Sequence, residues 1–486
     1  MQPPLALPAI NSKRGPTLEL LILALPMIGM TLSRMLMGFI DFVMVSWMGT
    51  AAQAAISPAT MLLFAISCVG MGLVQGVQTF VSQADGRGEP QRSGAYVWQT
   101  FYIAAFFALL TLPVAVYSPV WFDAFGRWAG HPADVQAMEI DYIRIALWVV
   151  APATLCVGLE SFYNGIHRPT VGLIAMLASL VVNALGNYAL ILGRWGFPEM
   201  GIAGAALATV IGWWVRVAIL MVPLLFFRSI DARYHTLRSF GPNLEKLRDI
   251  VKIGLPVSFQ WLVDIGAWVV FMHVMLPRFG ESAMAGANIA FQCMHLAFMP
   301  ALGIGMALTT QVGNAVGARD AGLAEMRVRV ARRLILGYMG AMGGLFILAG
   351  EPIARIFTAD EFVVLAAIPM LIWTAVFQVS DGMCVTYSFA LRGAGDTRVP
   401  ALLFAACCWG IFVVGGLALS HYAPGLWIHA PWSMCALYII VLGVLLLRRF
   451  HSRAWERIKL FHDRPGTVDA AGGGEIQAAT APTTAG

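Results

Sequence analysis

The chain has 486 residues, of which 59% are hydrophobic and only 12% are charged. Soluble domains carry about twice that share of charged residues, so the composition excludes an ordinary soluble protein and indicates a polytopic membrane protein. The net charge of +5 reflects the placement of basic loops and does not point to a nucleic-acid partner.

Twelve apolar stretches are candidates for membrane-spanning helices, each of which needs about 20 residues to cross a bilayer core of about 30 Å. The shortest, 333–348, spans only if Arg332 and Arg333 extend their charges to the interface. In chain order the stretches are 18–47, 57–82, 94–119, 138–163, 169–193, 201–227, 253–277, 283–315, 333–348, 363–391, 400–419 and 426–447.

The distribution of basic residues predicts the topology. Lys13 and Arg14 precede a first stretch that is too long for a signal peptide and lacks a small-residue cleavage site, so no cleaved signal is expected. With the N-terminus inside, most of the 31 lysines and arginines fall on the cytoplasmic side, as the positive-inside rule requires. We therefore expect a bacterial inner-membrane (plasma membrane) protein with both termini in the cytoplasm. All seven cysteines lie in the stretches without metal-ligand spacing, which predicts small buried side chains.

The chain divides into two similar halves. The longest polar interruption, Arg228–Lys252, separates six stretches from six. Three motifs recur at an offset of about 230 residues: Pro26 and Pro256, Thr79–Gly86 and Thr310–Gly317, and Ser161-Phe162 and Ser388-Phe389. This recurrence predicts a duplicated six-helix unit. Because six is even, the halves are parallel repeats, which commonly rock against each other in transporters.

These features give the expected domain organisation. We predict an N-lobe over residues 1–230, a cytoplasmic linker over 231–252, a C-lobe over 253–450 and a basic tail over 451–486. From about Phe461 the tail turns to Gly, Ala, Thr and Pro, a composition typical of disorder.

Three aspartates, Asp41, Asp264 and Asp381, lie inside apolar stretches. A carboxylate at bilayer depth is costly, so it usually faces a protein interior or aqueous cavity and marks the path of an ion or substrate. The chain is therefore predicted to move a solute across the membrane.

Asp41 is predicted to belong to a polar site in the first half. Counted from the outer ends of their stretches, Asp41, Asn187 and Thr209 all lie roughly 10–12 Å deep. Asn183 is one turn deeper on the same helix face as Asn187. One carboxylate with amide and hydroxyl oxygens could hold a proton or ligate a hard cation such as Na⁺; polar contacts between helices are the alternative.

Asp264 and Asp381 are predicted to pair in the second half, since both lie about 16–18 Å from the cytoplasmic ends of their stretches. In a shared cavity each carboxylate would raise the other's proton affinity, and the pair would titrate as a unit. Such a pair suits a proton, Na⁺ or a cationic substrate. Asn288 and Gln292, four residues apart, are the expected polar companions; separate structural partners for the two aspartates are the alternative.

Other side chains near these depths complete the predicted interior. Arg34 and Arg216 are equally deep and could share a cavity or link to Glu160, but the sequence assigns no partners. Aromatic residues beside the second-half carboxylates suit lipophilic cations through apolar and cation–π contacts, with core packing as the alternative. The chosen residues are Trp261, Phe291, Trp373 and Tyr387.

Several motifs together resemble those of MATE (multidrug and toxic compound extrusion) transporters, in particular the NorM-like branch. They cover nearly the whole chain, from about residue 18 to 447. The motifs are Leu25-Pro26-Met27-Ile28, Gly38-Phe39-Ile40-Asp41, the stretch from Gly201 to Thr209, Leu255-Pro256 with an acid eight residues after the proline, and Gln378-Val-Ser-Asp381 followed by Leu391-Arg-Gly-Ala-Gly-Asp-Thr397.

The resemblance implies an all-α membrane protein whose twelve transmembrane helices form two six-helix lobes arranged as a V. It implies efflux of amphipathic, often cationic drugs in exchange for inward H⁺ or Na⁺, without another cofactor and by a monomer. The matched positions imply an N-lobe cation site at Asp41, Asn183, Asn187 and Thr209 and a C-lobe acidic pair at Asp264 and Asp381. Gln378 of the quoted motif joins the predicted substrate cavity.

Two departures from the family pattern bear on the ion. Asp264 stands where the family usually has the longer Glu, and Asn288 where it has Gln, so the choice between H⁺ and Na⁺ stays open. A lipid or lipid-linked saccharide flippase of related fold is the alternative function; it would need a more basic interior than Arg34 and Arg216 supply. A membrane enzyme would need a catalytic constellation in an interface loop, and the short loops contain none.

Overall fold

The computed structural model describes residues 15–129 and 132–461, and in these ranges every regular element is helical. Twelve helical segments of the described chain are long and apolar enough to cross a membrane, which confirms the predicted number of spans. Lys13, Arg14 and the predicted disordered tail beyond Phe461 lie outside the described residues.

The first half contains the helices that form one lobe. In chain order they are α1 (Pro16–Ser46), α2 (Thr50–Val74), α3 (Gly76–Gly86), α4 (Ser93–Val116), α5 (Ser118–Ala129), α6 (Ala133–Ala146), α7 (Val150–Gly165), α8 (Thr170–Ile191) and α9 (Ile202–Phe226). A short helix, α10 (Arg228–Tyr234), leads toward the second half.

The second half forms the other lobe. Its helices are α11 (Leu244–Val270), α12 (Glu281–Gly317), α13 (Ala321–Leu348), α14 (Gly350–Phe357), α15 (Glu361–Ala394), α16 (Arg398–Cys407), α17 (Gly416–Tyr422) and α18 (His429–His451). A π-helical segment, Cys408–Gly415, joins α16 to α17, and another, Phe271–Met275, continues α11.

The structure corrects the shortest predicted span. The apolar stretch 333–348 is only the second part of α13, which begins at Ala321 and has 28 residues. The hydropathy pattern misses the first part because it carries Arg327, Arg329 and Arg332. The helix is therefore long enough to cross a bilayer and to continue beyond it.

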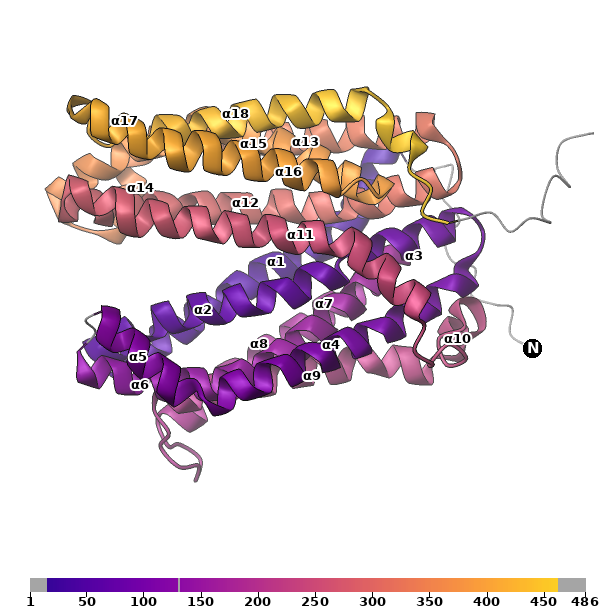
Figure 1. Ribbon diagram of the computed structural model, residues 1–486, viewed down its shortest axis with the longest axis horizontal. Coiled ribbons are helices and arrows are strands. Elements are labelled where there is room, and N and C mark those ends of the chain that lie inside the picture. The colour runs from indigo at the N-terminus through magenta and orange to yellow at the C-terminus, as the bar shows by residue number, and fades with distance from the viewer. Residues whose placement is uncertain (1–14, 130–131, 462–486) are drawn as a thin grey trace, which may run out of the picture.

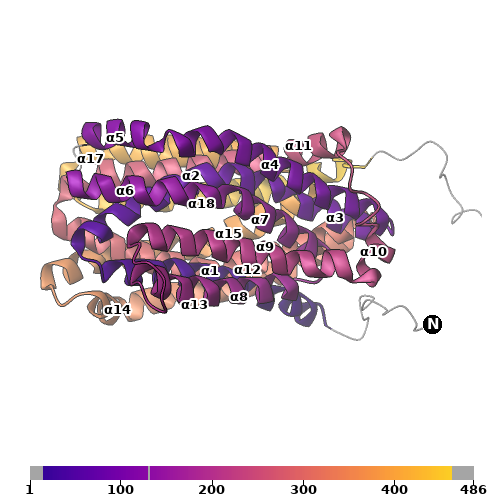
Figure 2. The ribbon, with the colours of Figure 1, turned by 90° about the horizontal axis from the view of Figure 1, so that it is seen from below.

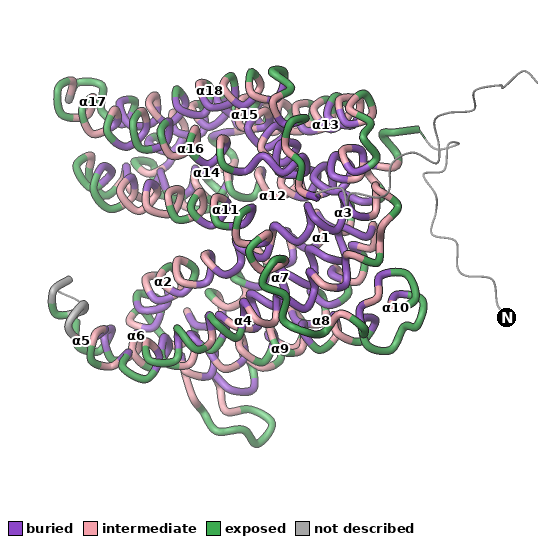
Figure 3. The backbone as a smooth tube through the Cα atoms, turned by 45° about the vertical axis from the view of Figure 1, so that its right-hand side comes forward, coloured by how far each residue is buried: buried purple, intermediate pink, exposed green. Residues whose placement is uncertain are grey.

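The two lobes form a V (Figure 1), which confirms the predicted fold. The lobes meet at the end of the molecule that carries α10 and the start of α1, which we call the terminal end, and diverge toward α5, α14 and α17, which we call the open end. Seen from below, the helices run along one common axis (Figure 2). Buried residues lie inside each lobe and where the lobes meet (Figure 3).

Packing between the lobes follows the predicted repeat. The first helix of each half packs against the second helix of the other, α1 on α12 and α11 on α2. The second helix of each half also starts in the same way, after Gly49 (φ 110°) in one half and Gly280 (φ 92°) in the other. These left-handed conformations favour glycine at both turns. The halves are therefore equivalent in local backbone as well as in order of helices.

Hydrogen bonds across the lobes concentrate at the terminal end. Gln78 Nε2 donates to Met306 O and Thr310 Oγ1, both at 2.8 Å, and Gln83 Nε2 donates to Gly393 O at 2.9 Å. Thr79 Oγ1 donates to Arg392 O at 3.0 Å. Most of these groups are side chains bonded to backbone carbonyls, so the contact is polar and specific to one register of the two lobes.

Backbones approach closely in the same region. A Cβ atom on Gly86 would overlap the carbonyl oxygen of Asn314, and one on Gly317 would overlap that of Gln83. Gly86 and Gly317 close the two repeated motifs, so the recurrence seen in the sequence marks the surface on which the lobes meet.

Candidate ion and substrate sites in the two lobes

The N-lobe polar site joins the four residues that the sequence grouped by depth. Asn187 Nδ2 donates to Asp41 Oδ1 at 2.5 Å, and Thr209 Oγ1 donates to Asp41 Oδ2 at 3.4 Å. Asn183 Nδ2 donates to Thr209 Oγ1 at 3.2 Å, and the Asn187 amide reaches Asn183 Oδ1 at 3.5 Å. The site therefore draws one residue from α1, two from α8 and one from α9.

Small residues bring α8 and α9 together at this site. A Cβ atom on Gly186 would lie 3.0 Å from the Ala208 side chain, and one on Gly212 would lie 3.2 Å from Ser179 Oγ. Such small residues let helices in a membrane approach closely. The Gly- and Ala-rich start of α9 thus sets the distance between Thr209 and the asparagines of α8.

The N-lobe site is rich in oxygen. Asn183 and Asn187 have no exposed surface, and Asn187 Oδ1 has no hydrogen-bond partner among the described residues. That oxygen and those of Asp41, Asn183 and Thr209 form a set of hard donors of the kind that bind alkali and alkaline-earth cations. Asp41 is the one acid among these four residues, so a cation bound by them would have a single carboxylate ligand.

A second charged cluster lies deeper in the same lobe. Glu160 Oε1 pairs with Arg216 Nη2, and Glu160 Oε2 lies 3.6 Å from Arg34 Nη2. The Glu160 and Arg216 side chains are buried, whereas the Arg34 side chain is 41% exposed. The structure thus assigns the partners of both arginines, which the sequence left open.

This cluster is aligned with the Asp41 site. Arg34 lies seven residues before Asp41 on α1, and Arg216 lies seven residues after Thr209 on α9. Seven residues are two helical turns, or about 10.5 Å along one face. Two guanidinium groups and one carboxylate leave one excess positive charge, which offsets the negative charge of Asp41 above it.

The C-lobe pair comes from α11 and α15. Asp264 and Asp381 are close enough to interact electrostatically, and Trp268 follows Asp264 by about one turn of α11. Cys408 and Tyr438 lie within electrostatic range of Asp264. Cys408 begins the π-helical segment of the lobe, and such segments are frequent at functional sites.

Aromatic rings flank this pair, although not all of them are those that the sequence suggested. Trp268 contacts Phe291 (ring centroids 5.1 Å apart) and Phe412 (5.5 Å), and Phe412 stacks on Tyr438 at 5.3 Å. Phe291 was predicted. Trp268 could have been found, since it follows Asp264 by one turn, but no spacing in the sequence connects Phe412 or Tyr438 to an acid.

Within the described residues, no hydrogen bond or ring contact joins the remaining predicted residues to either carboxylate. Asn288 and Gln292 are exposed on α12, and no hydrogen bond among the described residues joins them to either carboxylate. Trp261 contacts Phe64 of the other lobe at 6.0 Å, and Trp373 Nε1 donates to His429 Nδ1 at 2.9 Å.

Two of the predicted cavity residues, Tyr387 and Gln378, are buried. The Tyr387 hydroxyl accepts a hydrogen bond from Arg332 Nη1 at 3.2 Å, near the terminal end. Gln378 has no exposed surface, and its amide has no partner within the described ranges. Tyr387 therefore lies apart from the acidic pair, and the roles of Asn288, Gln292 and Gln378 beside the pair stay predictions.

The arrangement matches a known family. A family model described as MatE matches residues 26–189 and 265–416. The chain belongs to the MATE family. A probable multidrug resistance protein NorM from Rhodopseudomonas palustris is 30% identical over 90% of this chain and 92% of its own length. Another from Rhizobium meliloti is 29% identical over 84% of this chain and 88% of its own length.

Solved structures share the fold. An outward-facing MATE transporter superposes with a TM-score of 0.81 at 21% identity, covering 92% of this chain and 98% of that one. A eukaryotic MATE transporter gives 0.80 at 18% identity, covering 91% and 96%. These findings confirm the resemblance to NorM-like MATE proteins, and they identify a multi-pass membrane transporter and not an enzyme.

Proposed function

We propose that this MATE protein exports amphipathic, often cationic compounds in exchange for inward-moving H⁺ or Na⁺. The single observation that carries the proposal is the placement of acidic sites in both lobes of a V: Asp41 in one and the Asp264–Asp381 pair in the other. The names of the relatives, probable multidrug resistance proteins, support the substrate class.

We assign the coupling ion to the N-lobe site. The Asp41 carboxylate is held by hydrogen bonds to Asn187 and Thr209, and the unpaired Asn187 Oδ1 supplies a further ligand. A small cation gains most from oxygens that are already in place. H⁺ and Na⁺ compete for this one carboxylate, so either can drive exchange.

We assign the cationic substrate to the C-lobe pair. Asp264 and Asp381 supply negative charge, and Trp268, Phe291 and Phe412 supply aromatic faces and edges nearby. A lipophilic cation gains from both apolar contact and cation–π attraction in such surroundings. Two close carboxylates without a cation would share a proton, which the substrate displaces.

Exchange requires that ion and substrate favour different states of the two lobes. Since the lobes meet at the terminal end and diverge at the other, we assign the open end to the outside of the plasma membrane and both termini to the cytoplasm. The many arginines of α13 and the other segments near the terminal end support this orientation. We expect the protein to act as a monomer in the lipid bilayer on small molecules.

A flippase for lipid-linked saccharides is less well supported. The diphosphate of its substrate would need free basic groups in the interior, and both deep arginines, Arg34 and Arg216, are paired with Glu160.

The test of the export proposal is uptake of a fluorescent cation into everted vesicles after a proton jump or a sodium jump. Uptake driven by neither gradient would contradict the proposal.

The variant Asn187→Ala is expected to identify the coupling ion, because it should raise the affinity of the Asp41 site for H⁺ and lower its affinity for Na⁺. Loss of the amide donor favours the protonated Asp41, so the half-maximal pH of proton-driven export should rise by about one unit. Loss of the amide oxygen removes a ligand, so half-saturation by Na⁺ should require about tenfold more Na⁺. Both are measured as initial rates of fluorescent-cation uptake. Gln53→Ala, an exposed amide at the start of α2, is the matched control and should shift neither value.

A further inference from the structure

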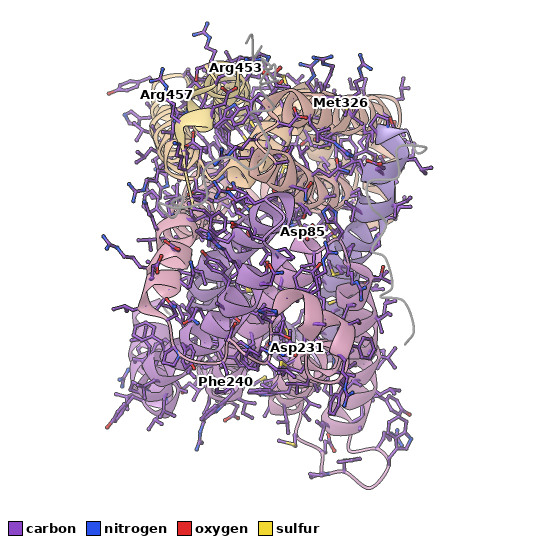
Figure 4. The ribbon with its side chains drawn as sticks, turned by 90° about the vertical axis from the view of Figure 1, so that its right-hand side faces the viewer. Asp85, Asp231, Phe240, Met326, Arg453 and Arg457 are labelled. Carbon is purple, nitrogen blue, oxygen red and sulfur yellow. The ribbon has the colours of Figure 1, made fainter. Side chains whose placement is uncertain are left out.

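A basic cavity lies near the terminal end of the C-lobe, apart from both acidic sites. It has a volume of about 290 Å³ and lies between α13, α15 and the end of α18. Its lining includes Arg329, Arg332, Tyr387, Phe450, His451 and Arg453. Figure 4, which faces the terminal end, labels Arg453 and the neighbouring Met326 on this lobe.

Two cations of this cavity lack a carboxylate partner among the described residues. Arg329 has no ion pair there, and the only polar contact of Arg332 is the Tyr387 hydroxyl, at 3.2 Å. Two neighbouring arginines are paired instead: Arg327 with Glu19 at 2.5 Å, and Arg449 with Asp396 at 2.7 Å. Arg329 and Arg332 therefore concentrate uncompensated positive charge in a concave space, which favours an anion.

The geometry of the cavity restrains its basic groups. Arg329 and Arg332 are three residues apart on one face of α13, with Glu325 one turn before them. The Arg453 guanidinium lies 2.5 Å from Glu325 across the cavity, which fixes the chain after α18 against α13. The hydroxyl of the buried Tyr387 fixes Arg332. The restrained guanidinium of Arg332 and the free one of Arg329 on the same helix face can together contact the oxygens of a phosphate group.

The position of the cavity selects the source of the phosphate. The apolar part of α13 begins at Leu334, directly after Arg332 and Arg333, so the cavity lies at the level where the helix leaves the bilayer. Its wall is also partly apolar, with the Tyr387 and Phe450 rings 5.6 Å apart. Basic pockets between transmembrane helices at this level bind the head groups of anionic lipids.

We propose that this cavity binds the phosphate of an anionic phospholipid of the leaflet at the terminal end. The proposal is independent of the transported substrate and of the coupling ion. It assigns to Arg329 and Arg332 a role as head-group ligands, with Tyr387 and Glu325 positioning the basic groups around them.

The test is native mass spectrometry of the purified full chain, titrated with dioleoylphosphatidylglycerol or dioleoylphosphatidylcholine. The wild-type protein is expected to bind the anionic dioleoylphosphatidylglycerol more tightly than dioleoylphosphatidylcholine. A basic group that contacts the head group contributes about fivefold in affinity, so Arg329→Gln should weaken binding about fivefold and the double variant with Arg332→Gln about 25-fold. Arg333→Gln, an exposed neighbour that does not line the cavity, is the matched control.

The outcomes separate the two sources of phosphate. Competition by inorganic phosphate, lost in the same variants, would support the anion site but assign it to soluble phosphate. Equal affinity of wild type and both variants, or an equal loss in Arg333→Gln, would overturn the proposal. Arg329 is exposed and has no ion pair with the residues that the structure describes, so its variant should keep the wild-type melting temperature, and a binding loss in it does not reflect misfolding.

Discussion

Replacing Gly86 and Gly317 together by alanine is expected to lower drug export more than tenfold by keeping the lobes apart at the terminal end. Each added methyl group would overlap a carbonyl oxygen of the opposite lobe, that of Asn314 or that of Gln83. Overpacking of this kind costs about 2 kcal/mol, so two overlaps shift the ratio of the two lobe arrangements by about three orders of magnitude.

The expected shift acts on one state only, because these overlaps exist only when the lobes meet. The same contact holds the hydrogen bonds of Gln78, Thr79 and Gln83 to the C-lobe. A transporter that must separate the lobes there needs a closed contact strong enough to seal it and weak enough to break. The double variant destabilises the state in which the lobes meet at the terminal end, so the transporter seldom adopts that state and export falls.

The measurement is a distance distribution between spin labels on Gln91→Cys and Arg333→Cys, exposed positions on opposite lobes. All seven native cysteines are buried, so the labels attach mainly at the introduced sites. The double glycine variant should lengthen this distance relative to wild type. Gly337→Ala is the matched control, because a Cβ atom there has no neighbour within 4 Å. An unchanged distance and unchanged export in the double variant would show that the terminal end does not close as described.

Apolar length and the recurring motifs predicted twelve spans in two similar halves, and the resemblance to MATE transporters implied that these halves form a V. It also predicted the Asp41 site, since depth along three helices and the four-residue spacing of Asn183 and Asn187 placed the four residues at one level. The structure brings them within hydrogen-bonding distance. The contacts of the other site residues depend on how each helix is rotated about its axis, and depth along a helix does not give this rotation.

Tyr387 illustrates this limit. It follows Asp381 by six residues, which turns it to another face of α15 and moves it about 9 Å along the axis. It lines the basic cavity instead of the acidic pair. In the same way, equal depth placed Arg34 and Arg216 at one level but could not show that both point to Glu160. The contact between Thr79–Gly86 and Thr310–Gly317 was seen only as a repeat, because similarity between segments says nothing about which surfaces touch.

The variant Asp41→Asn is expected to abolish the dependence of export on an ion gradient, with little change in the fold. Asparagine has nearly the same size as aspartate but carries no charge, so it neither exchanges a proton nor balances a bound cation. Coupling between two sites is typically worth 5- to 150-fold in affinity, so gradient-driven accumulation of a fluorescent cation in everted vesicles should fall by about that range. Exchange of labelled for unlabelled drug without a gradient should persist, since the substrate is assigned to the other lobe.

The double variant Asp264→Asn and Asp381→Asn is expected to show the opposite pattern. It should weaken binding of cationic drugs, measured as a higher drug concentration for half-maximal export, while a neutral amphipathic substrate is still exported by the same gradient. Asp134→Asn, an exposed aspartate in the first turn of α6, is the matched control and should change neither property. If the C-lobe variant instead loses gradient dependence and Asp41→Asn keeps it, the ion binds in the C-lobe and the assignment of the two sites must be exchanged. The comparison is decisive because the two assigned acidic sites lie in different lobes, and neutralising one leaves the charges of the other in place.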